Sequence, residues 1–264
     1  GQGTRLLTHL VGLGKTYTAT IRLGVGTTTD DAEGETLGET RDATDLPPAA
    51  IEEAASALRG DIRQVPSTVS AIKVDGKRAY ARARAGEDVQ LDARPVRIDR
   101  FSVLEQRTDG KYLDLDVVVT CSSGTYVRAL ARDLGAALGV GGHLTALRRT
   151  AVGPFAVEDA VHVPARGEGD DVDLPLAGLG ATAARVLGTL TVRPQDGRAL
   201  GLGQRITVAS ADVETREPGS DLADGSDGDR PVAALDDQGR LLALLTREGQ
   251  RWRPRLVIPE GARS

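Results

Sequence analysis

Apolar and polar residues alternate along three segments in the first half of the chain, which is the pattern of half-buried strands. The clearest segment is 113–121, where every second side chain is apolar up to Cys121. Residues 16–23 and 96–104 share this period of two, and the turn residues 108–110 separate the last two strands. These segments predict a mainly antiparallel sheet.

Apolar residues at helical intervals predict helices between the strands. Residues 47–58 begin with two prolines and have an apolar inner face, as expected for a helix that packs on a core. After Gly124 the period changes from two to that of a helix, which Ser123 or Thr125 can cap and Gly139 can stop. Shorter helices are predicted over 4–10, 77–85 and 177–187.

The last third of the chain has shorter strands and an acidic connection before them. Residues 164–175 carry acidic residues, Gly and Pro, which is typical of a linker. Residues 232–235 and 240–245 flank the turn sequence 236–239, a hairpin signal, and 252–258 predicts another strand. The sequence therefore predicts the α+β class, with a mixed, mainly antiparallel sheet domain, flanking helices and a small C-terminal β-barrel.

Composition narrows the class of protein. A chain of 264 residues with 40% hydrophobic content can bury cores for one large and one small domain. It has no apolar run near the roughly 20 residues that cross a bilayer, so we expect a soluble protein. The single cysteine cannot form an internal disulfide, which indicates a reducing cytoplasm, and the three scattered histidines give no metal-ligand spacing. Because the sequence contains no methionine, we expect it to be a fragment or a processed chain.

The net charge of −5 argues weakly against a nucleic-acid partner, but the charges are segregated along the chain. Lys and Arg outnumber Asp and Glu in residues 59–100 and 122–150. Acidic residues concentrate in 158–173 and 212–229, which also carry Gly, Pro and Ser and are expected to be solvated. Such a chain can hold phosphates on one surface and repel them elsewhere.

Tyr126 and Arg128 are the first candidates for site chemistry, because they lie where a strand gives way to a helix. Free backbone N–H groups and the helix dipole attract an anion, such as a phosphate or carboxylate, to a first helical turn. The alternative is a packed tyrosine beside a solvated arginine. This stretch alone favours neither interpretation.

Four segments match the motifs of one enzyme family in order and spacing. They include RLGVGTTTDDAEG within 15–34, PSTVSAIK within 66–80, SSGTYVRALARDLG at 122–135 and GHLTALRR at 142–149. Together they make residues 4–155 resemble the TruB-type tRNA pseudouridine synthases. The match is specific because several separate motifs agree at once.

The resemblance implies a reaction and a substrate. In this family a uridine in the T-loop of tRNA, at position 55, is isomerised so that a carbon–carbon glycosidic bond replaces the carbon–nitrogen bond. No cofactor is implied, because nothing is added or removed. The nucleotide must be extruded from the stacked loop into a closed pocket, which flat aromatic and apolar walls suit.

The resemblance also implies roles for individual residues. Tyr17 would stack on the flipped uracil, Leu147 would line the pocket, and Tyr126 would lie against the reacting ring. Arg128 would pair with the nucleophilic aspartate, and Lys73 would bind the RNA. Without the resemblance, Tyr17 and Leu147 would be interpreted as core residues and Lys73 as a solvated lysine.

The nucleophilic aspartate itself is absent from this sequence. In the family it lies in a G-H-x-G-T-L-D-P motif upstream of the segment matched by residues 1–10, and residues 1–264 contain no such pattern. Asp30 and Asp31 belong to a different family segment and do not take its role. We therefore expect the parent protein to be an active synthase and this chain to be inactive alone.

The resemblance extends to domains and partners. It implies a catalytic domain over 1–163 with an RNA-gripping insertion at 66–91, a linker and helix over 164–187, and a PUA-like RNA-binding domain over 188–264. The implied partner is the T-arm of tRNA, and we expect a cytoplasmic monomer without membrane or metal partners. The acidic insertion at 212–229 departs from the PUA pattern.

Two other interpretations remain open. A non-catalytic tRNA-binding or tRNA-folding module is favoured if no H-x-G-T-L-D-P motif precedes residue 1, whereas such a motif favours the enzyme. A nucleotide-dependent enzyme would use Gly14, Lys15 and Thr16, but the phosphate-loop pattern needs a glycine at position 9, where His9 stands.

Overall fold

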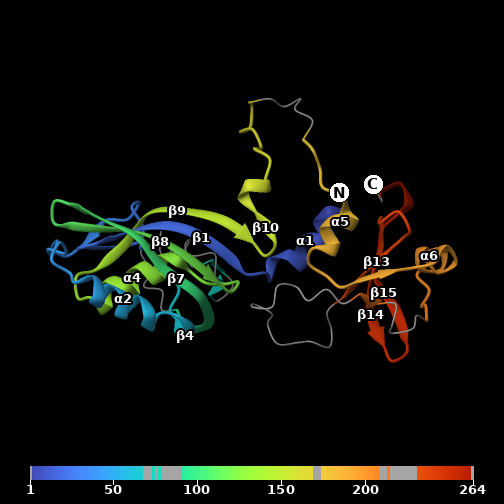
Figure 1. Cartoon of the computed structure of the whole chain (residues 1–264), viewed down its shortest axis with the longest axis horizontal. Helices are drawn as coiled ribbons and strands as arrows, with labels where there is room; N and C mark the ends of the chain where they lie inside the picture. Colours follow the sequence, from blue (N-terminus) through green and yellow to red (C-terminus); the bar gives the residue numbers. More distant parts are fainter. Residues whose placement is uncertain are drawn as a thin grey trace. The chain divides into compact units, whose positions relative to one another are not determined.

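The computed structural model describes residues 2–67, 73–74, 77–78, 91–168, 174–207, 213–214 and 231–262 (Figure 1). The chain divides into two compact units, one of residues 14–152 and the other of residues 1–13 together with 153–264. The boundaries of these units differ from those of the domains predicted from the sequence, which lie after residues 163 and 187. Those boundaries remain predictions.

The unit of residues 14–152 is built on an antiparallel sheet with the strand order β9-β1-β8-β7-β4. Its strands are β1 (Lys15–Leu23), β4 (Gly60–Gln64), β7 (Arg94–Asp109), β8 (Tyr112–Cys121) and β9 (Gly142–Val152). Two short pairs accompany them, β2 (Gly26–Thr27) with β3 (Thr36–Leu37) and β5 (Lys73–Val74) with β6 (Lys77–Arg78). The three strands predicted from the period of two are confirmed.

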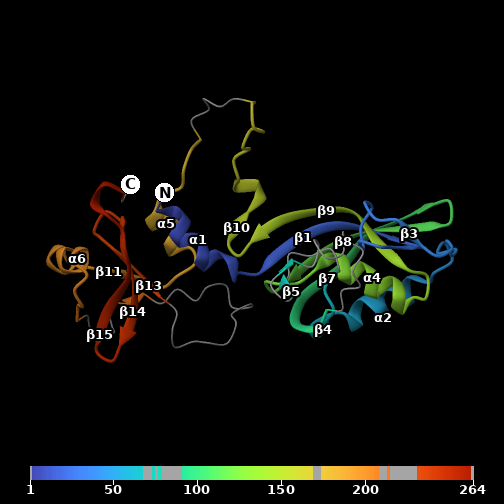
Figure 2. The ribbon, with the colours of Figure 1, turned by 180° about the vertical axis from the view of Figure 1, so that it is seen from behind.

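One face of this sheet forms the core of the unit, because its alternate residues are apolar. Ile21 of β1 lies opposite Leu115 of β8, and both are completely buried. The helices α2 (Pro48–Ala57) and α4 (Val127–Ala137) pack on this face and contact each other (Figure 1, Figure 2). The predicted helix over 47–58 is therefore confirmed as α2.

The other face of the sheet carries polar pairs. Thr20 Oγ1 donates to Asp116 Oδ1 at 2.7 Å, and Arg22 donates to the two oxygens of Asp114 at 2.8 and 2.7 Å. Successive strand residues point to opposite faces, so the alternation in the sequence separates this polar surface from the core.

α4 begins differently from the prediction. Its N-cap residue is Tyr126, and no side chain caps the helix, so the predicted caps Ser123 and Thr125 are wrong. Both residues lie in the turn around Gly124, whose φ of +89° delays the start of the helix. At the other end Gly139 follows the C-cap with a φ of +73°, as predicted for a stop.

The predicted basic helix over 77–85 is wrong at its start. Lys77 and Arg78 form β6, which pairs antiparallel with β5. This pairing needs extended backbone, which a helix excludes. The prediction for residues 79–85 lies outside the described residues.

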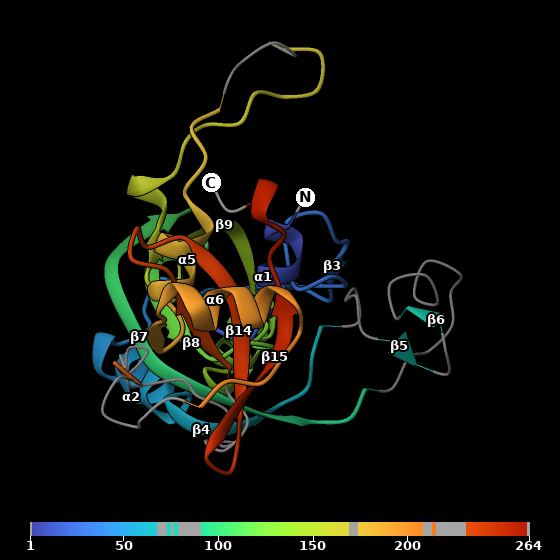
Figure 3. The same cartoon turned by 90° about the vertical axis from the view of Figure 1, so that its right-hand side faces the viewer.

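The second unit contains a sheet with the order β12-β11-β13-β14-β15, against which α6 packs (Figure 3). Its strands are β11 (Thr189–Thr191), β12 (Val213–Glu214), β13 (Val232–Leu235), β14 (Leu241–Glu248) and β15 (Arg251–Val257). The remaining elements are α1 (Gly3–Val11), β10 (Phe155–Ala156), η1 (Val157–Asp159), α5 (Leu179–Ala184), α6 (Pro194–Gly201) and η3 (Glu260–Ala262). β11 and β13 are parallel, whereas the other pairs are antiparallel.

The predicted hairpin of the second unit is confirmed, because β13 and β14 pair across residues 236–239. β14 is buried on both faces: Leu242 and Leu245 belong to one apolar cluster, Leu241 and Leu244 to another. The helix predicted over 177–187 is shorter in the structure and is α5. That this unit is a PUA-like β-barrel remains a prediction.

Candidate active site

At one end of the core face of the first sheet, two side chains are less buried than those of the core. In the register of β1 and β9, Tyr17 lies opposite Arg149 and Ala19 lies opposite Leu147. Directly opposed residues share a face, so these side chains lie on the same face as the buried core. Leu147 is nevertheless 48% exposed, and Tyr17 is only half-buried. An aromatic ring and an apolar side chain are therefore available there to a ligand.

Basic groups accompany Tyr17. Arg149 lies opposite Tyr17 in the register of β1 and β9, and Lys15 Nζ donates to Ser123 Oγ at 3.0 Å. Burial raises the pKa of the Tyr17 phenol, so the ring stays neutral. Burial, together with the charge of Arg149, lowers the pKa of Lys15. The surroundings of the ring favour an anion such as a phosphate.

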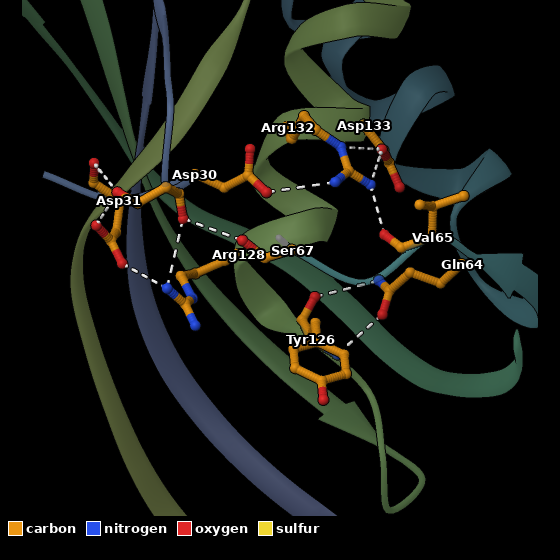
Figure 4. A network of polar contacts seen from close by, with 10 residues as sticks. Asp30, Asp31, Gln64, Val65, Ser67, Tyr126, Arg128, Arg132 and Asp133 are labelled. Atoms are coloured by element: carbon orange, nitrogen blue, oxygen red, sulfur yellow. Dashed lines mark hydrogen bonds and ion pairs between the residues drawn. The ribbon is translucent and has the colours of Figure 1, made fainter. Parts of the chain in front are cut away.

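The turn after β8 positions Tyr126 at the start of α4. Gly124 allows the tight turn, and the bond from Lys15 to Ser123 ties this turn to β1. The Gln64 side chain then holds the Tyr126 backbone (Figure 4). Gln64 Nε2 donates to the Tyr126 carbonyl oxygen at 3.1 Å, and the Tyr126 N–H donates to Gln64 Oε1 at 2.8 Å.

Arg128 lies in the first turn of α4 and pairs with Asp31 (Figure 4). Arg128 Nη1 lies 2.8 Å from Asp31 Oδ2 and 3.4 Å from the carbonyl oxygen of Thr29. The two charged side chains are 24% and 23% exposed, so the guanidinium does not extend into bulk water. Arg128 is therefore a paired, partly buried arginine.

The loop between β2 and β3 presents Asp31 as an ionised carboxylate. Burial alone would raise its pKa, but hydrogen bonds from the Thr29 hydroxyl, the Glu33 N–H and Arg128 together hold the pKa of Asp31 below its ordinary value. Arg128 therefore faces a carboxylate that stays charged at neutral pH.

A second charge pair fastens the same loop to α4. Arg132 Nη1 lies 3.3 Å from Asp30 Oδ2, and its other groups reach Asp133 at 2.9 Å and the carbonyl oxygen of Val65 at 2.7 Å. Asp30 has a φ of +60°, a left-handed conformation uncommon outside glycine. Burial raises its pKa, although the nearby charge of Arg132 opposes the shift.

The structure places four of the residues singled out in the sequence in two pairs. Tyr126 and Arg128 begin one helix, and Tyr17 and Leu147 share one sheet face. Lys73 lies in β5, but its side chain is outside what the structure describes.

Three residues of the candidate site, namely Asp31, Gln64 and Lys15, are not predicted from the sequence. The resemblance does not give Asp30 or Asp31 the role of nucleophile, because the family's nucleophile lies in another segment. The polar Gln64, which lies within the basic stretch 59–100, gave no signal, since its partner is the backbone of a residue 62 positions away. Lys15 belongs to the phosphate-loop alternative and to the first family-like segment, but neither gave it a role in the site.

Metal and membrane sites are not seen in the described part of the chain. Among those residues, no group of three or more His, Cys, Asp and Glu side chains is arranged to hold a metal ion. None of the described helices has the length and apolarity that a membrane crossing requires.

Two family descriptions match consecutive parts of the chain. "TruB family pseudouridylate synthase (N terminal domain)" matches residues 1–127. "tRNA pseudouridylate synthase B C-terminal domain" matches residues 128–164. The two ranges meet between Val127 and Arg128, so together they contain every element of the candidate site.

Proteins similar to this chain are named tRNA pseudouridine synthase B. A tRNA pseudouridine synthase B of Paenarthrobacter aurescens (strain TC1) is 46% identical over 98% of this chain and 80% of that protein. Another, from Mycobacterium avium (strain 104), is 49% identical over 97% of this chain and 80% of that protein. A solved structure titled "Crystal Structure of a Cbf5-Nop10-Gar1 Complex" has a similar fold, with a TM-score of 0.61 over 99% of this chain and 71% of the other at 20% identity.

Proposed function

The chain belongs to the TruB family of pseudouridylate synthases, and on that premise we propose that its parent protein isomerises the uridine at position 55, in the T-loop of tRNA, to pseudouridine. The reaction breaks the carbon–nitrogen glycosidic bond and forms a carbon–carbon bond to the same base. The hydrogen on the bonding carbon, C5, leaves to solvent and the freed ring nitrogen, N1, takes up a proton, so the product is an isomer of the substrate and the protein must hold the detached base while it turns. This requires a closed pocket and a carboxylate nucleophile.

In this proposal the pocket lies at the partly exposed end of the core face, where Tyr17 and Leu147 are found. Tyr17 stacks on the extruded uracil, Leu147 lines the opposite side, and Tyr126 lies against the reacting ring. Support comes from the register that sets Tyr17 and Leu147 on one face, and from their exposure there. Stacking on an aromatic ring favours any base, so sequence selection must come from other contacts with the T-arm.

Arg128 aims the nucleophilic carboxylate in this proposal, and its pairing with Asp31 is the observation that carries the proposed function. The 2.8 Å contact fixes the orientation of the guanidinium at a half-buried position. A planar guanidinium has five N–H donors and can hold a second carboxylate in a defined geometry. Asp31 is already committed to Arg128, Thr29 and Glu33, so it serves as an anchor and not as the nucleophile.

RNA binding involves further groups. Lys15 and Arg149 place positive charge beside Tyr17, where the phosphate of an extruded nucleotide would lie. We assign Lys73 and the RNA-gripping segment 66–91 to the T-arm, and the second unit to tRNA outside the T-loop. The family resemblance supports these assignments.

The test compares two forms of the protein on transcribed tRNA. The full-length polypeptide that contains residues 1–264 and the family's G-H-x-G-T-L-D-P motif should release tritium from uracil-labelled tRNA and form pseudouridine at position 55. A transcript with cytidine at that position should release none. The purified chain of residues 1–264 should bind tRNA without turnover.

The outcomes separate the interpretations. Turnover by residues 1–264 alone would show that the nucleophile lies within them. Tight tRNA binding without turnover by the full-length polypeptide would favour a tRNA-folding module over an enzyme.

A further inference from the structure

Gln64 is a buried polar residue with an unusual task. It ends β4 and is only 2% exposed, yet its amide is directed at the backbone of a residue on a different element. Its nitrogen donates to the Tyr126 carbonyl at 3.1 Å, and its oxygen accepts from the Tyr126 N–H at 2.8 Å. Two bonds to one residue fix its backbone orientation as well as its position, as one bond could not.

These bonds act at the point where α4 begins. Tyr126 is the N-cap residue, with a φ of −107° and a ψ of 104°, and no side chain caps the helix. Its carbonyl also accepts the first helical bond, from the Leu130 N–H at 3.2 Å. Gln64 therefore holds the residue that directs the first turn, and Arg128 lies two positions further along that turn.

The residues that follow Gln64 hold the opposite side of the site (Figure 4). The carbonyl oxygen of Val65 accepts from Arg132 at 2.7 Å, and Arg132 reaches Asp30 at 3.3 Å. Ser67 Oγ donates to the Thr29 carbonyl oxygen at 3.1 Å. A single short segment thus fastens both α4 and the loop that carries Asp31.

We propose that Gln64 is a positioning residue for the isomerisation, setting Tyr126 and Arg128 in their reactive orientation through its two bonds to the Tyr126 backbone. This inference rests on the proposed function of the site. Gln64 acts on the chemical step, because its side chain is buried and cannot itself contact tRNA. Its loss should lower kcat and leave KM and the tRNA affinity nearly unchanged.

The chemistry of the amide provides a sharp test. In Gln64→Glu, a neutral carboxyl group keeps one acceptor and one donor in nearly the same shape, so it can form both bonds. An ionised carboxylate only accepts, and it would face the Tyr126 carbonyl without a proton between them. Burial favours the neutral form, so the change between the two forms should occur above the ordinary pKa of glutamate. Gln64→Leu can form neither bond at any pH.

The experiment measures single-turnover rates and tRNA affinity of the full-length polypeptide from pH 5.5 to 8.5. The rate of Gln64→Glu, divided by the wild-type rate at the same pH, should fall at least tenfold as the pH rises from 5.5 to 8.5. The rate of Gln64→Leu should be at least tenfold below wild type at every pH in this range. tRNA affinity should change less than twofold. The matched control is Gln106→Glu, an exposed position on β7 that adds the same charge and should follow wild type.

A second measurement does not depend on activity and tests the two bonds even if a variant loses activity because it folds poorly. Hydrogen exchange of the Tyr126 amide should accelerate at least tenfold in Gln64→Leu and not in Gln106→Leu. Rates of both Gln64 variants within twofold of wild type, or an unchanged Tyr126 exchange rate, would overturn the assignment. If the wild-type polypeptide forms no pseudouridine while the exchange result holds, the proposed function fails and the structural role of Gln64 stands.

Discussion

Arg128 and Asp31 are held at the boundary between protein and solvent, with side chains 24% and 23% exposed. Charge pairs in such surroundings add little to stability, because the desolvation of both ions offsets their attraction. Their value lies in geometry, since the guanidinium is fixed before any substrate arrives. An enzyme gains most from groups that need no rearrangement during the reaction.

Substitution of Arg128 should therefore affect catalysis more than folding. We expect Arg128→Lys to slow single-turnover pseudouridine formation at least a hundredfold, because an ammonium cannot hold two carboxylates in one plane. Asp31→Asn should slow it about tenfold, and the double variant should be less than additive. The control is Arg193→Lys, at a side chain that is 74% exposed in the second unit. Arg128→Lys activity within threefold of wild type would contradict this role.

Cys121 should behave as a core residue. It is 1% exposed, and burial raises the pKa of its thiol to about 11. At pH 8 roughly one thiol in a thousand is ionised, so iodoacetamide should modify the folded protein at least a hundredfold more slowly than the protein in guanidinium chloride. The native rate should increase with pH as the thiolate fraction grows. Rapid modification of the folded protein at pH 8 would show that the thiol is accessible.

α4 packs closely against the start of β9, and glycine makes this possible. A Cβ atom on Gly135 would lie 2.2 Å from the backbone of both Gly141 and Gly142, closer than any real contact. The helix and the start of β9 can therefore pack together only without a side chain there. This contact fixes the relation between Arg128 on the helix and Leu147 on the strand.

Gly135→Ala should thus destabilise the first unit by about 3 kcal/mol, the upper range for inserting a methyl group into a packed site. Because backbone atoms form the obstruction, the strain cannot be relieved by a side-chain rotation. Gly26→Ala is the control, since a Cβ there meets no atom within 4 Å. Chemical denaturation followed by circular dichroism measures both. Equal midpoints for the two variants would show that α4 shifts without cost.

Across the whole molecule the net charge is −5, yet the site groups that would meet RNA are basic. Association with a polyanion depends on where the charges are and not on their sum. The segregation of charge along the sequence is therefore more informative than the isoelectric point of about 5.4.

Charge reversal at the RNA-gripping segment tests this view. Lys73→Glu and Lys77→Glu should each weaken tRNA binding and flatten its salt dependence by about one unit of slope per lost phosphate contact. Lys111→Glu changes the net charge equally, in the turn between β7 and β8, and should leave the slope unchanged. Binding isotherms at several salt concentrations measure this, and unchanged slopes for Lys73 and Lys77 would remove the assignment.

The sequence by itself determined three long strands of the first unit, its two helices and the family of the protein. The periods of strands and helices depend only on neighbours along the chain. The period of two therefore predicted the strands over 16–23 and 112–121, and the helical period predicted the helix after Gly124. The family motifs likewise predict that Tyr126 and Arg128 are site residues.

Only the tertiary structure decided which groups meet. Asp31 reaches Arg128 across 97 positions, and Gln64 reaches Tyr126 across 62. Such contacts follow from how strands pair and helices pack, which no local pattern encodes. The start of α4 was misjudged for the same reason, because a buried amide from β4, rather than a neighbouring hydroxyl, bonds to its first residue.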